Sequence, residues 1–187
     1  MTEAQACAAL KDKACLLSIA KEKEAMLKEG DEYLLDNVAK SYVAAEDYSA
    51  AERIIRMRSI EASASNECFR FARYSGAVRL VVEGNFVKAG EWLDDWVRCQ
   101  AHNEPNWETG YGEGGNLWSD LSIAYSSLSR AQAKTDDIIA ARENAEIALL
   151  LAIEAESTWR VQYVGYRAKD LGAAYGAAYG AFVALED

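Results

Sequence analysis

Residues 34–57 read LLDNVAKSYVAAEDYSAAERIIRM, and this stretch decides the fold class. Val38, Tyr42 and the apolar residues around them recur at helical spacing, so they form one apolar stripe on an amphipathic helix. Ser49 and Glu52 have the spacing of a capping box, which predicts that a second helix begins there. A connection this short makes the two helices antiparallel, so the stretch predicts a helix hairpin.

The same periodicity continues along the chain, which has 187 residues, 51% hydrophobic residues and a single proline. This composition predicts one soluble, all-α domain over residues 1–187. We expect a leading helix within 1–30, helical hairpins over 32–157 with a loop near 102–116, and a C-terminal packing helix over 159–185. The pattern predicts about eight helices, near 3–28, 32–46, 49–62, 66–83, 86–101, 117–134, 137–157 and 159–185.

Two of these hairpins, and less clearly a third, share a pattern across the turn. A first helix ends at a short polar turn, an aromatic or apolar residue follows, and an alanine comes three residues later, in segments 38–51, 76–89 and 121–141. The pattern resembles the tetratricopeptide repeat, although the repeated alanines are not 34 residues apart. The resemblance implies stacked antiparallel hairpins whose groove binds a peptide or protein. A generic helical bundle is the alternative, because alanine is common wherever helices pack closely.

Charge restricts the class of partner. The chain has 20 Lys and Arg against 30 Asp and Glu, a net charge of −10. This charge repels phosphate backbones and anionic lipid surfaces, so we expect neither direct nucleic-acid binding nor membrane binding. The first residues do not have the pattern of a secretory signal, and we therefore expect a cytoplasmic protein. The four cysteines have no zinc spacing, which favours reduced thiols that serve as small core residues.

The predicted loop near 102–116 contains the only histidine and four glycines. Its glycine spacing formally matches a dinucleotide fingerprint, but no strand precedes it, so the pattern does not indicate a nucleotide site. Cys99 and His102 are three residues apart, and two ligands do not make a metal site. We therefore expect no metal and no cofactor. The aromatic side chains of Trp107 and Tyr111 either cover a groove between hairpins or fix the loop to the core.

An arginine-rich segment interrupts the acidic chain. Residues 53–79 contain six Arg and two Glu, with aromatic residues interleaved. Guanidinium groups favour bidentate recognition of carboxylates or phosphates, so the segment is a candidate site for an acidic peptide or anionic ligand. In the alternative interpretation these arginines pair with acids of their own or neighbouring helices. With the loop aromatics, the candidate partner-binding residues are Arg53, Arg56, Arg70, Arg73, Tyr74, Trp107 and Tyr111.

The C-terminal segment carries no charge from Leu171 to Leu185 and has a glycine every four residues. Three glycines inside a helix cost about 3 kcal/mol relative to alanine, so a close helix contact is expected to offset them. That contact is either with the preceding helices of the same chain or with a second copy. The candidate oligomer-interface residues are Gly172, Tyr175, Gly176, Tyr179 and Gly180.

Together these patterns favour a protein without catalytic residues that binds a protein or peptide on a helical scaffold. A homodimer is a further expectation, because the C-terminal segment is a candidate interface. The alternative is an acidic inhibitor or antidote protein that blocks the basic nucleic-acid-binding surface of a partner, using rows of acids such as Glu32/Asp36 and Glu143/Glu146. An enzyme is the third hypothesis, and it requires His102 to meet a carboxylate or thiol at the loop.

Overall fold

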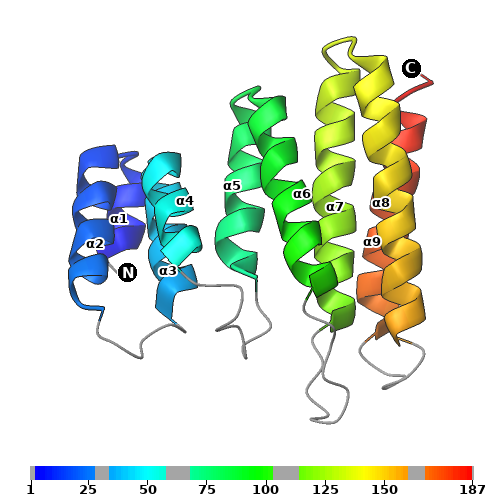
Figure 1. The fold of residues 1–187 in the computed structure, drawn as a ribbon. Coiled ribbons are helices and arrows are strands. Elements are labelled where there is room, and N and C mark those ends of the chain that lie inside the picture. The colour runs from blue at the N-terminus through cyan, green and yellow to red at the C-terminus, as the bar shows by residue number, and fades with distance from the viewer. Residues whose placement is uncertain (1–2, 28–33, 58–67, 103–113, 160–166, 187) are drawn as a thin grey trace. The chain divides into compact units, whose positions relative to one another are not determined.

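A computed structural model describes residues 3–27, 34–57, 68–102, 114–159 and 167–186 (Figure 1). These residues form nine α-helices and no strand, so the predicted all-α fold class is confirmed. The helices are α1 (Glu3–Ala9), α2 (Lys13–Ala25), α3 (Leu35–Ala44), α4 (Tyr48–Met57), α5 (Arg70–Val82), α6 (Phe86–His102), α7 (Gly114–Ala133), α8 (Ile138–Trp159) and α9 (Arg167–Val183).

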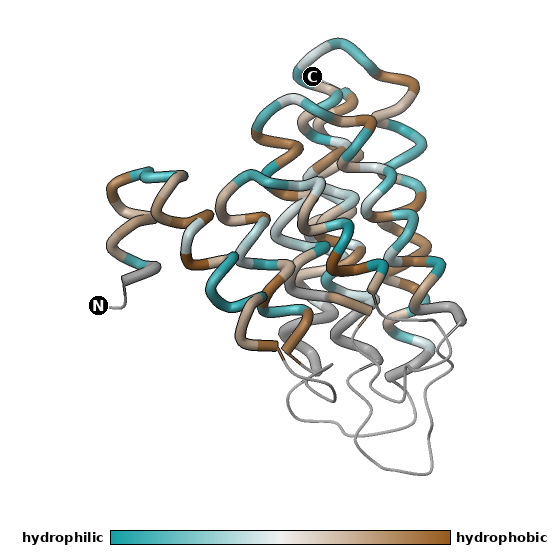
Figure 2. Tube along the Cα trace, turned by 60° about the vertical axis from the view of Figure 1, so that its left-hand side comes forward, coloured by the Kyte–Doolittle hydropathy of each residue, from teal (hydrophilic) through white to brown (hydrophobic). Residues whose placement is uncertain are grey.

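The chain divides into two compact units, Met1–Gly76 and Ala77–Asp187. The first unit contains α1 to α4 and the beginning of α5, and the second contains the rest of α5 and α6 to α9. Hydrophilic and hydrophobic residues alternate along the helices (Figure 2), as expected for helices that bury one face. The expectation of a single domain stays a prediction.

Four turns between consecutive helices have the same backbone geometry. In each turn a residue with positive φ is followed by an Asp or Asn that precedes the next helix. The amide of the positive-φ residue donates to the carbonyl three residues earlier, and the next amide donates to the carbonyl five residues earlier. This is the Schellman arrangement that ends a helix. The four pairs are Lys11-Asp12, Glu46-Asp47, Gly84-Asn85 and Asp136-Asp137.

The second residue of each pair also begins the next helix. Its side-chain oxygen accepts a hydrogen bond from the amide three residues later, for example Asp47 from Ala50 at 3.0 Å. Asp12, Asn85 and Asp137 accept equivalent bonds at 3.0, 3.3 and 3.4 Å. The side chain that caps α4 is therefore Asp47, and the prediction that Ser49 caps this helix is wrong. A left-handed residue followed by Asp or Asn thus ends one helix and starts the next with no intervening loop.

The first of these turns corrects the prediction of one continuous helix near 3–28. Lys11 has a φ of 53°, and Asp12 caps α2 by accepting from the amide of Cys15. No glycine or proline marks this break in the sequence, which is why periodicity alone did not reveal it. Cys7 and Cys15 form a disulfide that joins α1 to α2. Cys68 and Cys99 are disulfide-bonded as well, so the expectation that the four cysteines are reduced thiols is wrong.

In the first unit, α3 packs against both α2 and α4. Its buried face consists largely of Val38, Ala39, Tyr42 and Val43, and α4 contributes Ala51 and Ile54. Alanine at the contact allows the two helices to approach closely. The sequence stripe of the hairpin over 34–57 is thus the core of this unit.

In the second unit, α7, α8 and α9 pack against one another through small side chains. Ser122 and Ser129 of α7 are fully buried, and their hydroxyls donate to the carbonyls of Ala148 and Ala141 on α8, each at 2.7 Å. These bonds satisfy hydroxyl groups that would otherwise be costly to bury. The contact surfaces consist largely of Ser119, Ser122, Ser126, Ser129, Ala141, Ala145, Ala148, Ala152, Ala155, Ala174, Ala178 and Ala181.

Candidate functional site

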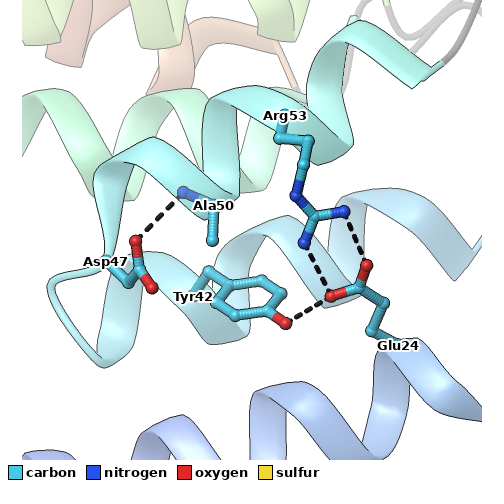
Figure 3. Close-up of polar contacts among 5 residues, drawn as sticks. All are labelled: Glu24, Tyr42, Asp47, Ala50 and Arg53. Carbon is cyan, nitrogen blue, oxygen red and sulfur yellow. Dashed lines mark hydrogen bonds and ion pairs between the residues drawn. The ribbon is translucent and has the colours of Figure 1, made fainter.

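Arg53, the first of the predicted binding arginines, is held by an acid of its own unit. Its Nη1 and Nη2 atoms donate to Oε1 and Oε2 of Glu24 at 2.6 and 2.9 Å. The hydroxyl of Tyr42 donates to the same carboxylate, at Oε2 (Figure 3). Glu24, Tyr42 and Arg53 come from α2, α3 and α4, so this polar cluster joins three consecutive helices.

The electrostatics of this cluster fix its protonation state at neutral pH. The hydrogen bonds from Arg53 lower the pKa of Glu24 against the opposing effect of burial, with a further contribution from Tyr42. Burial raises the pKa of Tyr42 to about 12, and the hydrogen bond to Glu24 adds to this effect. The carboxylate is therefore ionised, the guanidinium is protonated and the phenol is neutral. Such a cluster links helices and has no group that exchanges a proton near pH 7.

The other arginines of the 53–79 segment are not all described. Arg56 is exposed on α4, whereas Arg73 and Tyr74 are half-buried on α5. The side chain of Arg70, and Trp107 and Tyr111 in full, lie outside the described residues. For Arg53 the geometry matches the interpretation in which an arginine answers an acid from a neighbouring helix.

Asp36, from a predicted acidic row, and Asp94 both have structural roles. Asp36 on α3 is buried, and its carboxylate accepts a hydrogen bond from the amide of Ala72 in the first turn of α5, at 3.0 Å. A carboxylate at this position compensates the partial positive charge of the helix N-terminus. Asp94 on α6 accepts from the hydroxyl of Tyr125 on α7 at 2.5 Å. Burial, more than this bond, raises the pKa of Tyr125. Asp36 is therefore not part of an exposed acidic surface.

Two of the three glycines of α9 lie on its outer side. Gly172 and Gly176 are exposed, and a Cβ added at either would meet nothing within 4 Å. At Gly180 the nearest atom is Nη1 of Arg130 on α7, 3.9 Å from the added Cβ. The expectation that these glycines bring α9 close to the preceding helices is therefore wrong for Gly172 and Gly176. Alanines on the opposite side of α9 make that contact.

The tyrosines of α9 face two different environments. The hydroxyl of Tyr175 donates to a carboxylate oxygen of Glu156 on α8 at 2.6 Å, so this residue fixes α9 against α8. Tyr179, one turn later, is 72% exposed. Of the predicted interface residues, Gly172, Gly176 and Tyr179 thus lie on the outer surface of the described unit.

An apolar surface extends from α9 onto α8. Because the two helices are antiparallel (Figure 1), residues that precede Glu156 lie opposite residues that follow Tyr175. Ile153 is three residues before Glu156 and Tyr179 is four after Tyr175, so the two lie at about the same level. About one turn further along, Leu149 and Leu150 lie at about the level of Val183. We call this surface the α8–α9 face; its large residues, all exposed, are Leu149, Leu150, Ile153, Tyr179 and Val183.

The part of the α8–α9 face on α8 was missed by the sequence interpretation. Residues 147–153 read IALLLAI, an apolar run in which every side of a helix carries an apolar side chain. Only one side is buried, by α7 and α9, and Leu150 on the other side is 65% exposed. The sequence therefore did indicate an exposed apolar surface, since an uninterrupted apolar run on a helix that packs on one side leaves apolar residues exposed.

Other classes of site find little support in the described residues. Within that part of the chain, no group of three or more His, Cys, Asp or Glu side chains is placed to hold a metal ion. None of the described helices combines the length and apolarity needed to cross a lipid bilayer. His102 is the last residue of α6, but its side chain and the loop 103–113 lie outside the described residues. Comparisons with protein-family models, curated proteins and solved structures find no match.

Proposed function

We propose that the protein is a non-enzymatic scaffold that binds another polypeptide on the α8–α9 face. The observation that carries this proposal is the exposure of five large apolar side chains at adjoining positions on two packed helices. Exposed apolar residues scattered singly are normal on a protein surface, but a contiguous group usually marks an interaction site. The tetratricopeptide arrangement stays a prediction.

The surroundings of the face suit a docking surface. Gly172 and Gly176 leave space beside Tyr179 because they have no side chains. An aromatic side chain next to such space makes a good anchor, since it buries a large area at low conformational cost. The supporting helices are held together by buried serines and alanines, so the face is presented on a packed unit. These features favour protein binding over catalysis.

A site-specific crosslinking experiment in cells tests this proposal. A photoreactive amino acid replaces Leu150, and in a matched control it replaces Glu22, which is exposed on α2. We expect a covalent adduct with a protein from position 150 and none from position 22. The adduct is expected to disappear when Ile153→Gln and Tyr179→Gln are added, since these changes remove the neighbouring apolar contacts.

The outcome decides between the proposed function and its rivals. Absence of a protein adduct above the control, or an adduct that survives both glutamine substitutions, would contradict the proposal. The acidic-inhibitor hypothesis predicts instead that binding depends on charge alone and weakens steeply as salt rises. A complex anchored by apolar side chains is expected to keep most of its affinity in high salt.

A further inference from the structure

The α8–α9 face has acids at one of its ends. On α8, Glu146 lies about one turn before Leu149 and Leu150, and Glu143 lies about two turns before them. Glu186 lies three residues beyond Val183, the last residue of α9. Because α8 and α9 are antiparallel, these acids come to the same end of the face (Figure 1). All three are exposed.

Acidic residues outnumber basic residues in the unit that carries this face. The second unit contains nine Lys and Arg against 17 Asp and Glu, a net charge of −8. From Leu171 to Leu185 the chain of α9 has no charge, and Arg142, which is exposed near the acidic end, is the one basic residue of α8. An excess of acidic residues around an apolar surface favours cationic partners over anionic ones.

We propose that the partner bound at the α8–α9 face is a cationic amphipathic helix, with apolar residues over Leu150, Ile153 and Tyr179 and lysines or arginines toward Glu143, Glu146 and Glu186. This inference rests on the proposed function and specifies the chemistry of the partner. An amphipathic helix that lays its apolar side on a helical surface is a common recognition mode. Complementary charge at one end sets its orientation.

The dimensions of the face fit such a segment. Ile153 lies ten residues after Glu143, which corresponds to about 15 Å along α8. A partner helix of about three turns therefore spans both the apolar residues and the acids. A second copy of the chain is disfavoured as the occupant because two units of net charge −8 repel each other. An anionic membrane surface is disfavoured for the same reason.

Two synthetic helical peptides with the same leucine stripe provide the probes. One carries lysines and the other glutamates at the polar positions beside the stripe, and binding to the full chain is followed by fluorescence anisotropy. We expect the lysine peptide to bind about tenfold more tightly than the glutamate peptide at low salt. Leu150→Gln with Ile153→Gln is expected to weaken the binding of the lysine peptide about tenfold or more.

A charge-reversal variant and a matched control locate the effect. Glu143→Lys with Glu146→Lys is expected to abolish or invert the preference for the lysine peptide. Glu22→Lys with Glu91→Lys makes the same change in net charge at exposed positions on α2 and α6, and is expected to keep the preference. Helical circular dichroism verifies that each variant is folded.

Several results would overturn the inference. These are failure of the lysine peptide to bind, equal binding of both peptides, or an equal response of the two charge-reversal variants. A dimer in sedimentation equilibrium that Tyr179→Gln dissociates would also overturn it, since a second copy then covers the face. In each case a protein adduct from position 150 leaves the proposed function in place, whereas absence of that adduct removes the proposed function itself.

Discussion

Replacement of Tyr42 by Phe tests the polar cluster that joins α2, α3 and α4. Tyr42 is 2% exposed, so its ring is part of the buried core of the first unit. Phe keeps this ring and removes only the hydroxyl that donates to Glu24. Glu24 retains both hydrogen bonds from Arg53, so the change isolates a single interaction in the cluster.

The expected loss of stability at neutral pH is modest. A hydrogen bond to a charged group contributes about 1.5–3 kcal/mol. The side chain of Glu24 is 24% exposed, so water can replace the lost donor and reduces this effect. We therefore expect Tyr42→Phe to lower the free energy of unfolding by about 1–2 kcal/mol. Tyr179→Phe, at an exposed position, is the control and is expected to change it little.

The same substitution alters the dependence of stability on alkaline pH. In the folded protein the pKa of Tyr42 is about 12, against 10 for an ordinary tyrosine. The unfolded chain therefore ionises first, so the stabilisation of the neutral phenol is complete below about pH 10 and is lost as the pH rises to about 12. By about pH 11 the wild-type protein is expected to lose about 1.4 kcal/mol that the Phe variant does not lose.

Urea unfolding followed by helical circular dichroism, at about pH 8 and about pH 11, measures both effects. The other tyrosines, including Tyr125, are present in both proteins. Their titration therefore cancels in the difference in unfolding free energy between wild type and Tyr42→Phe. If the difference in unfolding free energy between wild type and Tyr42→Phe is the same at both pH values, Tyr42 is not the buried, Glu24-bonded phenol described above. A difference near zero at pH 8 would also refute the assigned hydrogen bond.

Three further predictions concern caps and glycines, each read out as urea stability. Asp47→Ala is expected to cost about 1 kcal/mol and Ser49→Ala much less, since Asp47 caps α4; equal costs would contradict this assignment. Asp36→Ala is expected to cost about 2–3 kcal/mol, because it leaves the N-terminus of α5 without its buried acceptor; a cost below half a kcal/mol would show that water replaces it. Gly84→Ala is expected to destabilise the protein by about 1 kcal/mol, because Gly84 has a φ of 77°. Gly176→Ala is expected to stabilise it by a similar amount, because the position is helical and has space for a methyl group; opposite signs would contradict both assignments.

Part of the candidate site was predictable from sequence. The charge-free stretch from Leu171 to Leu185 and its glycines singled out α9, and Gly172, Gly176 and Tyr179 do lie on its outer side. Which neighbours they contact was not predictable, because Gly and Ala alternate so closely that either side of the helix could have been buried. The positions of α7 and α8 decided that the alanine side is covered.

Counting charges over the arginine segment does not show which acid each arginine contacts. The sequence shows an excess of arginine over 53–79, but the pairing of Arg53 with Glu24 joins residues 29 positions apart. Nothing local in the chain indicates that pairing. It follows from the packing of α2 and α4 on either side of α3, which brings both side chains to the hydroxyl of Tyr42.

The amino-acid sequence by itself determined the all-α class, the approximate places of most helices and the acidic character of the chain, because these depend on local periodicity and composition. Only the tertiary structure decided which Asp caps α4, that α1 and α2 are separate helices, and that Leu149, Leu150 and Ile153 are exposed beside Tyr179. These features depend on the backbone conformation of single residues and on which side of each helix is covered by neighbouring helices. Burial is a property of contacts between distant segments, and a local pattern of residues does not contain it.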